Sequence, residues 1–221
     1  MNEHIYLISG LGADERVFQN LDFGRLRPTF IQWIEPKDNE SIQEYALRLS
    51  EQIHTNKPII LGVSFGGMIA IEIAKRIDYQ QVILISSAKT KTEISLIYRI
   101  LGRLKLHKLI PISLFKQANI LTYWFFGMNT KAEKEMLKGI LHDTDSTFLK
   151  WAMDAILNWK NEIIIDKLVH IHGNNDRILP IHYIKKVDLI ILNGGHLMIF
   201  NRADVINDAL IIKESSGLTR L

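Results

Sequence analysis

The run GVSFGG at residues 62–67 constrains this chain more than any other part of its sequence. The apolar residues 58–61 before it predict a buried strand, and residues 68–76 after it predict a helix. A G-x-S-x-G run between a strand and a helix requires a tight turn, which lifts the serine hydroxyl above the edge of the sheet. The glycines leave room for that turn. Ser64 is therefore a candidate nucleophile, which still needs a base and an oxyanion site.

Short apolar strands alternate with amphipathic helices on both sides of a long helical block. We expect strands at 4–9, 31–34, 58–61, 81–87, 167–172 and 187–192, and helices at 41–53, 68–76 and 203–213. This alternation is typical of a mostly parallel sheet flanked by crossover helices, the α/β class. Residues 88–161 predict only helices. We therefore expect a single domain over residues 1–221, with a core of 1–87 and 162–221 and a helical cap at about 88–161 over the carboxyl edge of the sheet.

Composition excludes several classes of protein. The 221 residues are 47% hydrophobic, which is enough to bury a large core. A net charge of +3 from 27 basic and 24 acidic residues, without a basic run, argues against a nucleic-acid partner. The chain has no cysteine, so it can form neither a disulfide nor a thiolate metal site. Without a signal peptide or an apolar run near the roughly 20 residues that span a bilayer, we expect a cytoplasmic protein with no membrane partner.

One histidine stands apart from the other seven as a candidate base for Ser64. His196 follows an Asn-Gly-Gly sequence immediately after the last expected strand. Two glycines let a loop turn sharply and present the next side chain over the sheet. The alternative is an ordinary surface or core histidine. We favour the catalytic interpretation because the other histidines lie within, or at the ends of, expected strands and helices.

A third residue must orient the imidazole and stabilise its cation. Asp176 lies in the loop that follows the expected strand at 167–172, so it belongs to the same edge of the sheet as Ser64 and His196. Asp166 precedes that strand and should lie at the opposite edge. Capping of a turn is the alternative role for an aspartate in such a loop. We predict that Asp176 is the acid of the constellation.

The oxyanion site requires backbone N–H groups that point at the developing negative charge. Phe65 supplies one because it directly follows the serine, and Leu11 can supply the other from the glycine-rich turn at 9–12. An ordinary strand-to-helix turn is the alternative. A phosphate cradle is disfavoured, because the turn lacks a third glycine and places Asp14 and Glu15 where a pyrophosphate would lie.

Across nearly its whole length the chain resembles a small member of the α/β-hydrolase superfamily, in which the triad follows the chain order Ser, Asp, His. The resemblance rests on residues 10–12, 62–67, 172–180 and 194–196. It implies a sheet shortened at its amino end, because the strand at 4–9 resembles the family's third strand. Ser9 is a departure, since relatives often have histidine at that position.

The resemblance also implies roles for individual residues. It assigns the triad to Ser64, His196 and Asp176, and the oxyanion hole to the amides of Leu11 and Phe65. No metal or organic cofactor is implied. The expected reaction is hydrolysis of a small-molecule ester or related acyl compound through an acyl-serine. A serine nucleophile argues against dehalogenase or epoxide-hydrolase chemistry.

Several alternatives share the same residues. The triad could serve a thioesterase, an amidase, a C–C hydrolase, an acyltransferase or a hydroxynitrile-lyase-like reaction, and the fold could also be a small-molecule receptor with little turnover. Specificity should come from the cap. Its aromatic run at 121–128 includes Trp124 and Phe126, which either pack as the core of the cap or line an apolar acyl pocket. The sequence carries no signal for oligomeric state.

Overall fold

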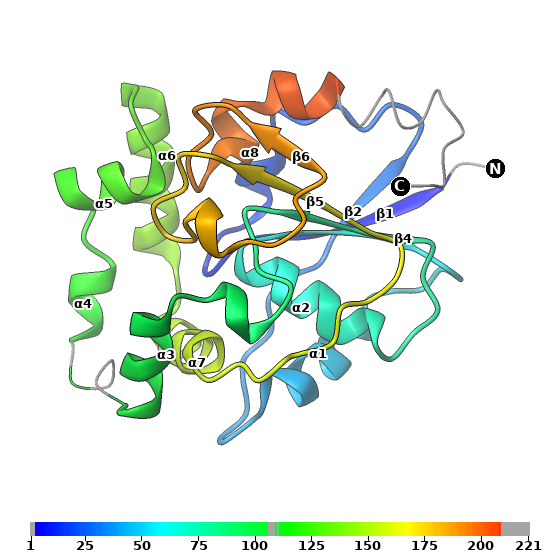
Figure 1. Ribbon diagram of the computed structural model, residues 1–221, viewed down its shortest axis with the longest axis horizontal. Coiled ribbons are helices and arrows are strands. Elements are labelled where there is room, and N and C mark those ends of the chain that lie inside the picture. Colours follow the sequence, from blue (N-terminus) through cyan, green and yellow to red (C-terminus); the bar gives the residue numbers. More distant parts are fainter. Residues whose placement is uncertain (1–2, 106–108, 110, 209–221) are drawn as a thin grey trace.

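A computed structural model describes residues 3–105, 109 and 111–208 around one central sheet (Figure 1). The sheet has six strands in the order β2-β1-β3-β4-β5-β6, and every neighbouring pair is parallel. The strands are β1 (His4–Ile8), β2 (Arg27–Phe30), β3 (Ile59–Val63), β4 (Gln81–Ile85), β5 (Leu168–Gly173) and β6 (Leu189–Ile191). The expected α/β class is confirmed.

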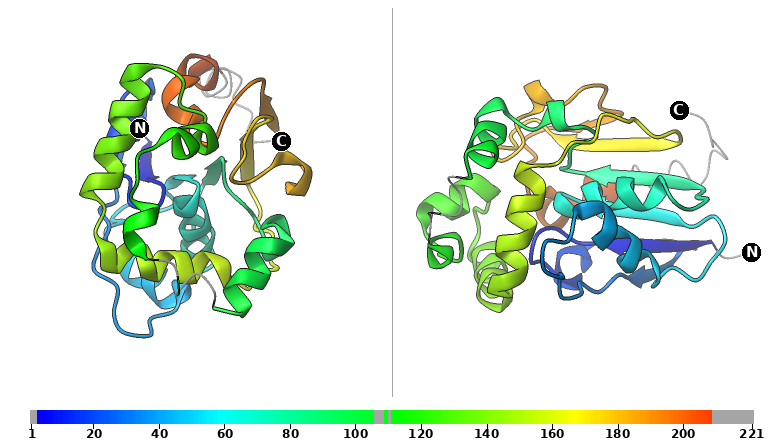
Figure 2. Two further views of the ribbon diagram at one scale, coloured as in Figure 1. Left: turned by 90° about the vertical axis from the view of Figure 1, so that its left-hand side faces the viewer. Right: turned by 90° about the horizontal axis from the view of Figure 1, so that it is seen from below.

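Helices cover both faces of the sheet, so the inner strands are buried on both sides (Figure 2). Alternate residues of a strand point to opposite faces, and they divide the core into two clusters. One cluster packs against α1 (Ile42–Ser50) and α2 (Phe65–Ala74). The other packs against η1 (Glu15–Phe18) and α8 (Met198–Asn201). The apolar runs of β3 and β4 follow from this double cover.

The second strand was expected at 31–34 and instead occupies Arg27–Phe30. Its partner β1 ends at Ile8, where the glycine turn begins, and Leu7 pairs with Phe30 in the register. Beyond Ile31, whose N–H still donates to Leu7 O, the described residues offer no neighbouring strand to pair with. The prediction of a strand at 31–34 was therefore wrong, because the end of β1 determines which residues of the second strand can pair with it.

Every regular element in the described part of the segment between β4 and β5 is a helix. Its elements are η2 (Lys91–Glu93), α3 (Leu96–Arg103), α4 (Ile112–Phe115), α5 (Ile120–Phe126), α6 (Lys131–Asp143) and α7 (Ser146–Leu157). These helices lie beyond the carboxyl ends of the strands, at the left of Figure 1. This segment is called the cap below, and its role as a cap over the site stays a prediction.

The end of the chain returns to the sheet. A 3-10 turn, η4 (Ile181–Tyr183), lies between β5 and β6. Helical residues continue at 203–208, and the remainder of the helix expected at 203–213 lies outside the described residues. None of the helices in the described ranges combines the length and apolar character needed to cross a membrane.

Candidate active site

Ser64 occupies the sharp turn between β3 and α2. Its φ of 52° and ψ of −118° form a conformation that a residue with a side chain rarely adopts. Backbone hydrogen bonds hold the turn: Ser64 N–H donates to Ile85 O at 3.0 Å, and Gly67 N–H donates to Ser64 O at 3.0 Å. The Ser87 hydroxyl also donates to Ser64 O, at 2.7 Å. Hydrogen bonds with β4, with the loop that follows it and with α2 therefore hold the strained turn.

The glycines around Ser64 are required by close backbone packing. A Cβ added to Gly62 would lie 2.5 Å from the Cα of Gly67. A Cβ added to Gly66 would collide with the carbonyl oxygens of Ile8 and Ser9. Side chains at these positions would push α2 away from β1 and β3, so the spacing of the glycines follows from the geometry of the turn.

The structure brings together the three residues that the sequence predicted for the triad. Ser64 Oγ lies 2.8 Å from His196 Nε2, and His196 Nδ1 lies 2.8 Å from Asp176 Oδ2. His196 is 3% exposed and Asp176 is 4% exposed, whereas Ser64 is partly exposed. A carboxylate accepts the Nδ1 proton, which leaves Nε2 free to accept the serine proton.

Asp176 is held as a hydrogen-bond acceptor by its own loop. Its Oδ1 accepts from Ile178 N–H at 2.9 Å and from Leu179 N–H at 2.8 Å. Burial would raise the pKa of this carboxyl, but the charge of His196 and its hydrogen bond outweigh burial, so the pKa lies below its ordinary value. Asp176 is therefore ionised at neutral pH and can stabilise a cationic His196.

The turn that follows β1 lies beside Ser64. A Cβ added to Gly10 would be 3.6 Å from Ser64 Cβ. Ser9 holds the turn, since its hydroxyl lies 2.5 Å from Ala13 O and accepts from Trp33 Nε1 at 3.0 Å. In the described part of the chain, no backbone hydrogen bond of the turns and loops uses the N–H of Leu11 or of Phe65. Both amides are thus free to meet a ligand.

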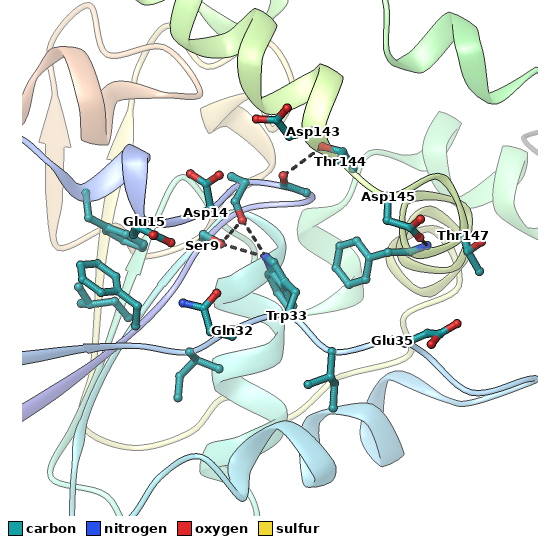
Figure 3. Close-up of a pocket in the computed structure, with 18 residues that line it drawn as sticks. Ser9, Asp14, Glu15, Gln32, Trp33, Glu35, Asp143, Thr144, Asp145 and Thr147 are labelled. Carbon is teal, nitrogen blue, oxygen red and sulfur yellow. Dashed lines mark hydrogen bonds between the residues drawn. The ribbon is translucent and has the colours of Figure 1, made fainter.

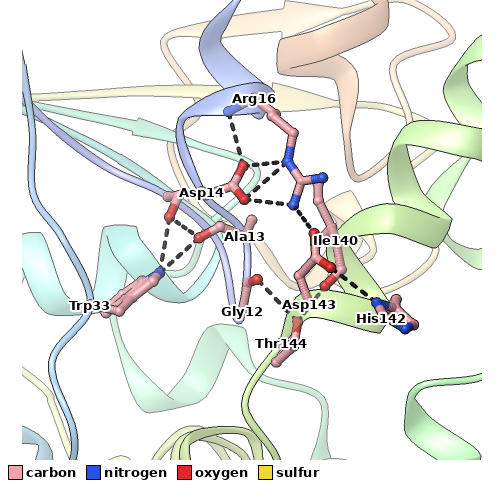
Figure 4. A network of polar contacts seen from close by, with 10 residues as sticks. Gly12, Ala13, Asp14, Arg16, Trp33, Ile140, His142, Asp143 and Thr144 are labelled. Carbon is pink, nitrogen blue, oxygen red and sulfur yellow. Dashed lines mark hydrogen bonds and ion pairs between the residues drawn. The ribbon is translucent and has the colours of Figure 1, made fainter.

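One contact joins this turn to the cap (Figure 4). Thr144, at the end of α6, places its hydroxyl 3.0 Å from Gly12 O, and a Cβ on Gly12 would collide with the Thr144 side chain. Arg16 bridges the two parts, with Nη2 at 2.6 Å from Asp14 and 2.8 Å from Asp143. The hydrogen bond from Arg16 lowers the pKa of Asp14. The cap and the turn that follows β1 therefore touch directly.

A second contact joins the cap to the histidine loop. The ring of Phe126 meets the ring of His196 edge-on, with 5.8 Å between centroids, and Leu197 N–H donates to Phe126 O at 3.3 Å. Trp124 is instead 53% exposed, and the Arg177 guanidinium lies 4.5 Å from its ring centroid. Of the two aromatic residues that the sequence singled out, Phe126 is the one beside the triad.

A cavity of about 530 Å³ lies next to the oxyanion turn (Figure 3). Ser9, Trp33 and Phe148 line it, and Trp33 stacks on Phe65 with 5.6 Å between centroids. Neither Ser64 nor Phe65 lines this cavity, and Trp33 is the residue that connects it to Phe65. Among the residues that the structure describes, no group of three or more histidine, aspartate or glutamate side chains is arranged to hold a metal ion.

Sequence reasoning missed a buried polar row behind Asp176. Lys89, His170 and His172 are all buried, and they connect the end of β4 to the acid loop. The available signal was the spacing of the two histidines, because residues two apart on a strand share one face of the sheet.

We compared the sequence and the fold with those of known proteins. No family model and no curated protein sequence matches the chain. Solved structures do. A bromoperoxidase from Bacillus anthracis aligns with a TM-score of 0.70 at 14% identity, covering 96% of this chain and 91% of that one.

Two esterases align as well. The thermophilic esterase from Thermogutta terrifontis aligns with a TM-score of 0.69 at 13% identity, covering 100% of this chain and 92% of that one. The esterase from Exiguobacterium antarcticum aligns with a TM-score of 0.67 at 14% identity, covering 95% and 91%. These likenesses, with the parallel sheet and the turn at Ser64, show that the chain has the α/β-hydrolase fold.

Proposed function

We propose that this protein is a serine hydrolase that cleaves esters or related acyl compounds through an acyl-Ser64 intermediate. One observation carries the proposal: the continuous hydrogen-bonded row from Ser64 Oγ through His196 to Asp176, with 2.8 Å at each step. A nucleophile, its base and an orienting acid within hydrogen-bond reach are the parts that nucleophilic catalysis needs.

Acylation would use these residues in order. Ser64 Oγ attacks the carbonyl carbon while His196 Nε2 takes the serine proton, and Asp176 stabilises the resulting imidazolium. The carbonyl oxygen becomes an oxyanion, and the amides of Leu11 and Phe65 donate to it. The tetrahedral intermediate collapses as the bond to the leaving group breaks, and His196 passes its proton to that group.

Deacylation would repeat the steps with water as the nucleophile. His196 Nε2 takes a proton from water as the water oxygen attacks the acyl carbon. The bond to Ser64 Oγ then breaks, the serine regains the proton from His196, and the free acid leaves. The cycle thus needs only water and the protein groups named above.

The similar structures support an acyl substrate. Two of the three structures compared above are esterases, and a further one, aligned with a TM-score of 0.70 at 16% identity, is described as an N-acyl homoserine lactone degrading enzyme. The ring of Phe126 beside His196 favours a substrate that is apolar near the reacting carbonyl.

A chain-length series of p-nitrophenyl esters tests the proposal. We expect a burst of nitrophenol that is stoichiometric with the protein, followed by slower turnover, because acylation and deacylation are separate steps. Ser64→Ala should lose both phases. Turnover that persists undiminished in Ser64→Ala would overturn the proposal.

A further inference from the structure

A row of three buried ionisable side chains runs behind the acid of the triad. Lys89 follows β4 and is 3% exposed, while His170 and His172 lie on one face of β5 with no exposed surface. Lys89 Nζ lies 2.8 Å from His170 Nδ1, and His170 Nε2 lies 3.3 Å from His172 Nδ1. The row is continuous, and the reaction scheme above does not use it.

The row ends on the loop that carries Asp176. His172 Nε2 lies 2.8 Å from Leu179 O and 3.5 Å from Asp176 Oδ2. Leu179 N–H in turn donates to Asp176 Oδ1 at 2.8 Å. The N–H of Leu179 is therefore held by Asp176, and its C=O is held by His172.

Lys89 is anchored at the other end of the row. Its ammonium donates to Lys185 O and lies 3.2 Å from Glu93 Oε1. Glu93 also accepts from the backbone N–H groups of Lys89, at 2.6 Å, and of Lys185, at 2.9 Å. Both carboxylate oxygens of Glu93 are thus engaged, and the ammonium has a fixed position.

Both imidazoles of the row are held neutral. Burial lowers the pKa of His170 well below its ordinary value, and the charge of Lys89 lowers it further. A hydrogen bond with the backbone of Ser87 acts in the opposite direction, but it does not outweigh them. Burial also lowers the pKa of His172, although Asp176 acts in the opposite direction. A neutral imidazole has one donor nitrogen and one acceptor nitrogen.

The charge of Lys89 then determines which ring nitrogen of His170 and of His172 carries the proton. An ammonium can only donate, so His170 Nδ1 must accept and the proton of His170 lies on Nε2. That Nε2–H donates to His172 Nδ1, which places the proton of His172 on Nε2 as well. His172 Nε2–H is therefore directed at Leu179 O and at the carboxylate of Asp176.

We propose that Lys89, His170 and His172 form a positioning chain, in which one buried ammonium fixes the tautomers of two histidines and, through His172, the place of the Asp176 carboxylate. The proposal rests on the proposed function for the role of Asp176, and it adds three residues that do not touch the substrate. Residues that hold a reacting group in place raise the rate of the chemical step with little effect on substrate binding.

Tautomers can be read without any substrate. Long-range proton–nitrogen correlation spectra of isotope-labelled protein distinguish an Nε2–H from an Nδ1–H imidazole. We expect single Nε2–H forms for His170 and His172 in the unmodified protein. In Lys89→Met, which keeps the length of the stem and removes the ammonium, His170 should show both forms. An Nδ1–H form of either histidine in the unmodified protein would overturn the chain.

Kinetics test the functional role, with the half-buried Lys75 as a control lysine. Lys75 donates to Glu72 at 2.9 Å and to Asn161 at 2.6 Å. Asn161 in turn donates to the backbone carbonyl of Lys89 at 2.7 Å, so this network meets Lys89 at its backbone and leaves its ammonium in place. Lys89→Met should lower kcat by about tenfold with KM unchanged, since displacement of a catalytic group slows the chemical step. Lys75→Met should destabilise the fold and leave kcat as it is. Equal kcat in Lys89→Met and the unmodified protein would contradict the proposal.

A second pair of variants covers the case in which Lys89→Met does not fold. His172→Gln retains a donor near the Nε2 position, whereas His172→Leu removes it. We expect His172→Gln to react with a fluorophosphonate at Ser64 about tenfold faster than His172→Leu. Equal rates for the two would overturn the role of His172. If even the unmodified protein is not labelled, the proposed function fails, while the tautomer spectra still decide whether the chain exists.

Discussion

The carboxyl edge of the sheet and the outer helices of the cap are built in opposite ways. At the edge, every residue of α2 is buried, and the three residues of the candidate triad follow the ends of β3, β5 and β6. In the cap, α4 and α5 contain no buried residue, and Ile120 is 88% exposed. The contrast teaches that the strand ends hold most of the candidate triad, and that the outer cap adds a few close contacts, among them that of Phe126 with His196.

The inner cap helix α7 shows what those outer helices lack. Phe148 and Trp151 of α7 pack against Tyr45 and Phe65, with ring centroids 4.2 to 6.5 Å apart. Such aromatic packing anchors α7 to the core of the domain. We therefore expect substitutions at the edge of the sheet to have large effects, and substitutions in the outer cap to have small and substrate-dependent effects.

The largest effect should come from the base of the triad. His196→Ala leaves Ser64 without a proton acceptor, so we expect kcat to fall by about 10⁴-fold or more. The melting temperature should fall by a few degrees, because loss of the buried ring leaves the buried Asp176 carboxylate without its partner, and circular dichroism checks that the variant is folded. A p-nitrophenyl ester assay measures kcat. Activity within tenfold of the unmodified protein would contradict the role of His196 as the base.

A pair of glycines tests the edge against the cap. Gly66→Ala would drive its Cβ into the carbonyl oxygens of Ile8 and Ser9, so we expect a loss of about 2 kcal/mol in the free energy of unfolding. Gly139→Ala lies in α6, where only the flexible end of Arg16 is near. It should be neutral or slightly stabilising, because alanine is the better helix former. Urea unfolding measures both, and equal losses would contradict the account.

Cap aromatics should alter substrate preference more than chemistry. Phe126→Ala removes the ring beside His196, so we expect KM for medium-chain esters to rise by about tenfold, while acetate esters change little. Trp124→Ala removes a half-exposed ring and should raise KM less. A chain-length series measures both effects. The same loss for every chain length would contradict a pocket role.

The smallest effect concerns Arg16, which pairs with Asp14 in its own turn and with Asp143 of the cap. The hydrogen bond from Arg16 lowers the pKa of Asp14, so the pair stabilises the fold above pH about 4 and loses its effect as pH falls through the lowered pKa. Arg16→Met should therefore cost about 0.5 kcal/mol at pH 7, a partly exposed pair being worth little. Urea unfolding at neutral and at strongly acid pH checks this. A difference that persists undiminished in acid would point to packing instead.

Local signals predicted most of the sheet edge, and contacts distant in sequence account for the rest. The turn at Ser64 and the loops of Asp176 and His196 were readable, because each carries its own glycine or turn residues after an apolar strand. The second strand was misplaced, since its limits depend on where β1 ends. The row from Lys89 to His172 was missed. The spacing of His170 and His172 predicts that they share one face of a strand, but no local pattern predicts that Lys89 meets them.

The same distinction applies to the cap. Its helices were predicted from their apolar periodicity, but their attachment was not. The contact of Gly12 with Thr144 joins residues 132 positions apart, and no sequence pattern near either residue predicts it. Predictions about the cap pocket therefore depend on the fold as a whole.

Labelling with a fluorophosphonate, followed by peptide mapping, tests the central claim most directly. The account predicts one adduct, on Ser64, that forms with time in the native protein and slows greatly in His196→Ala. Absence of any adduct on the folded protein, or an adduct on a different serine, would contradict the assignment of Ser64 as the nucleophile.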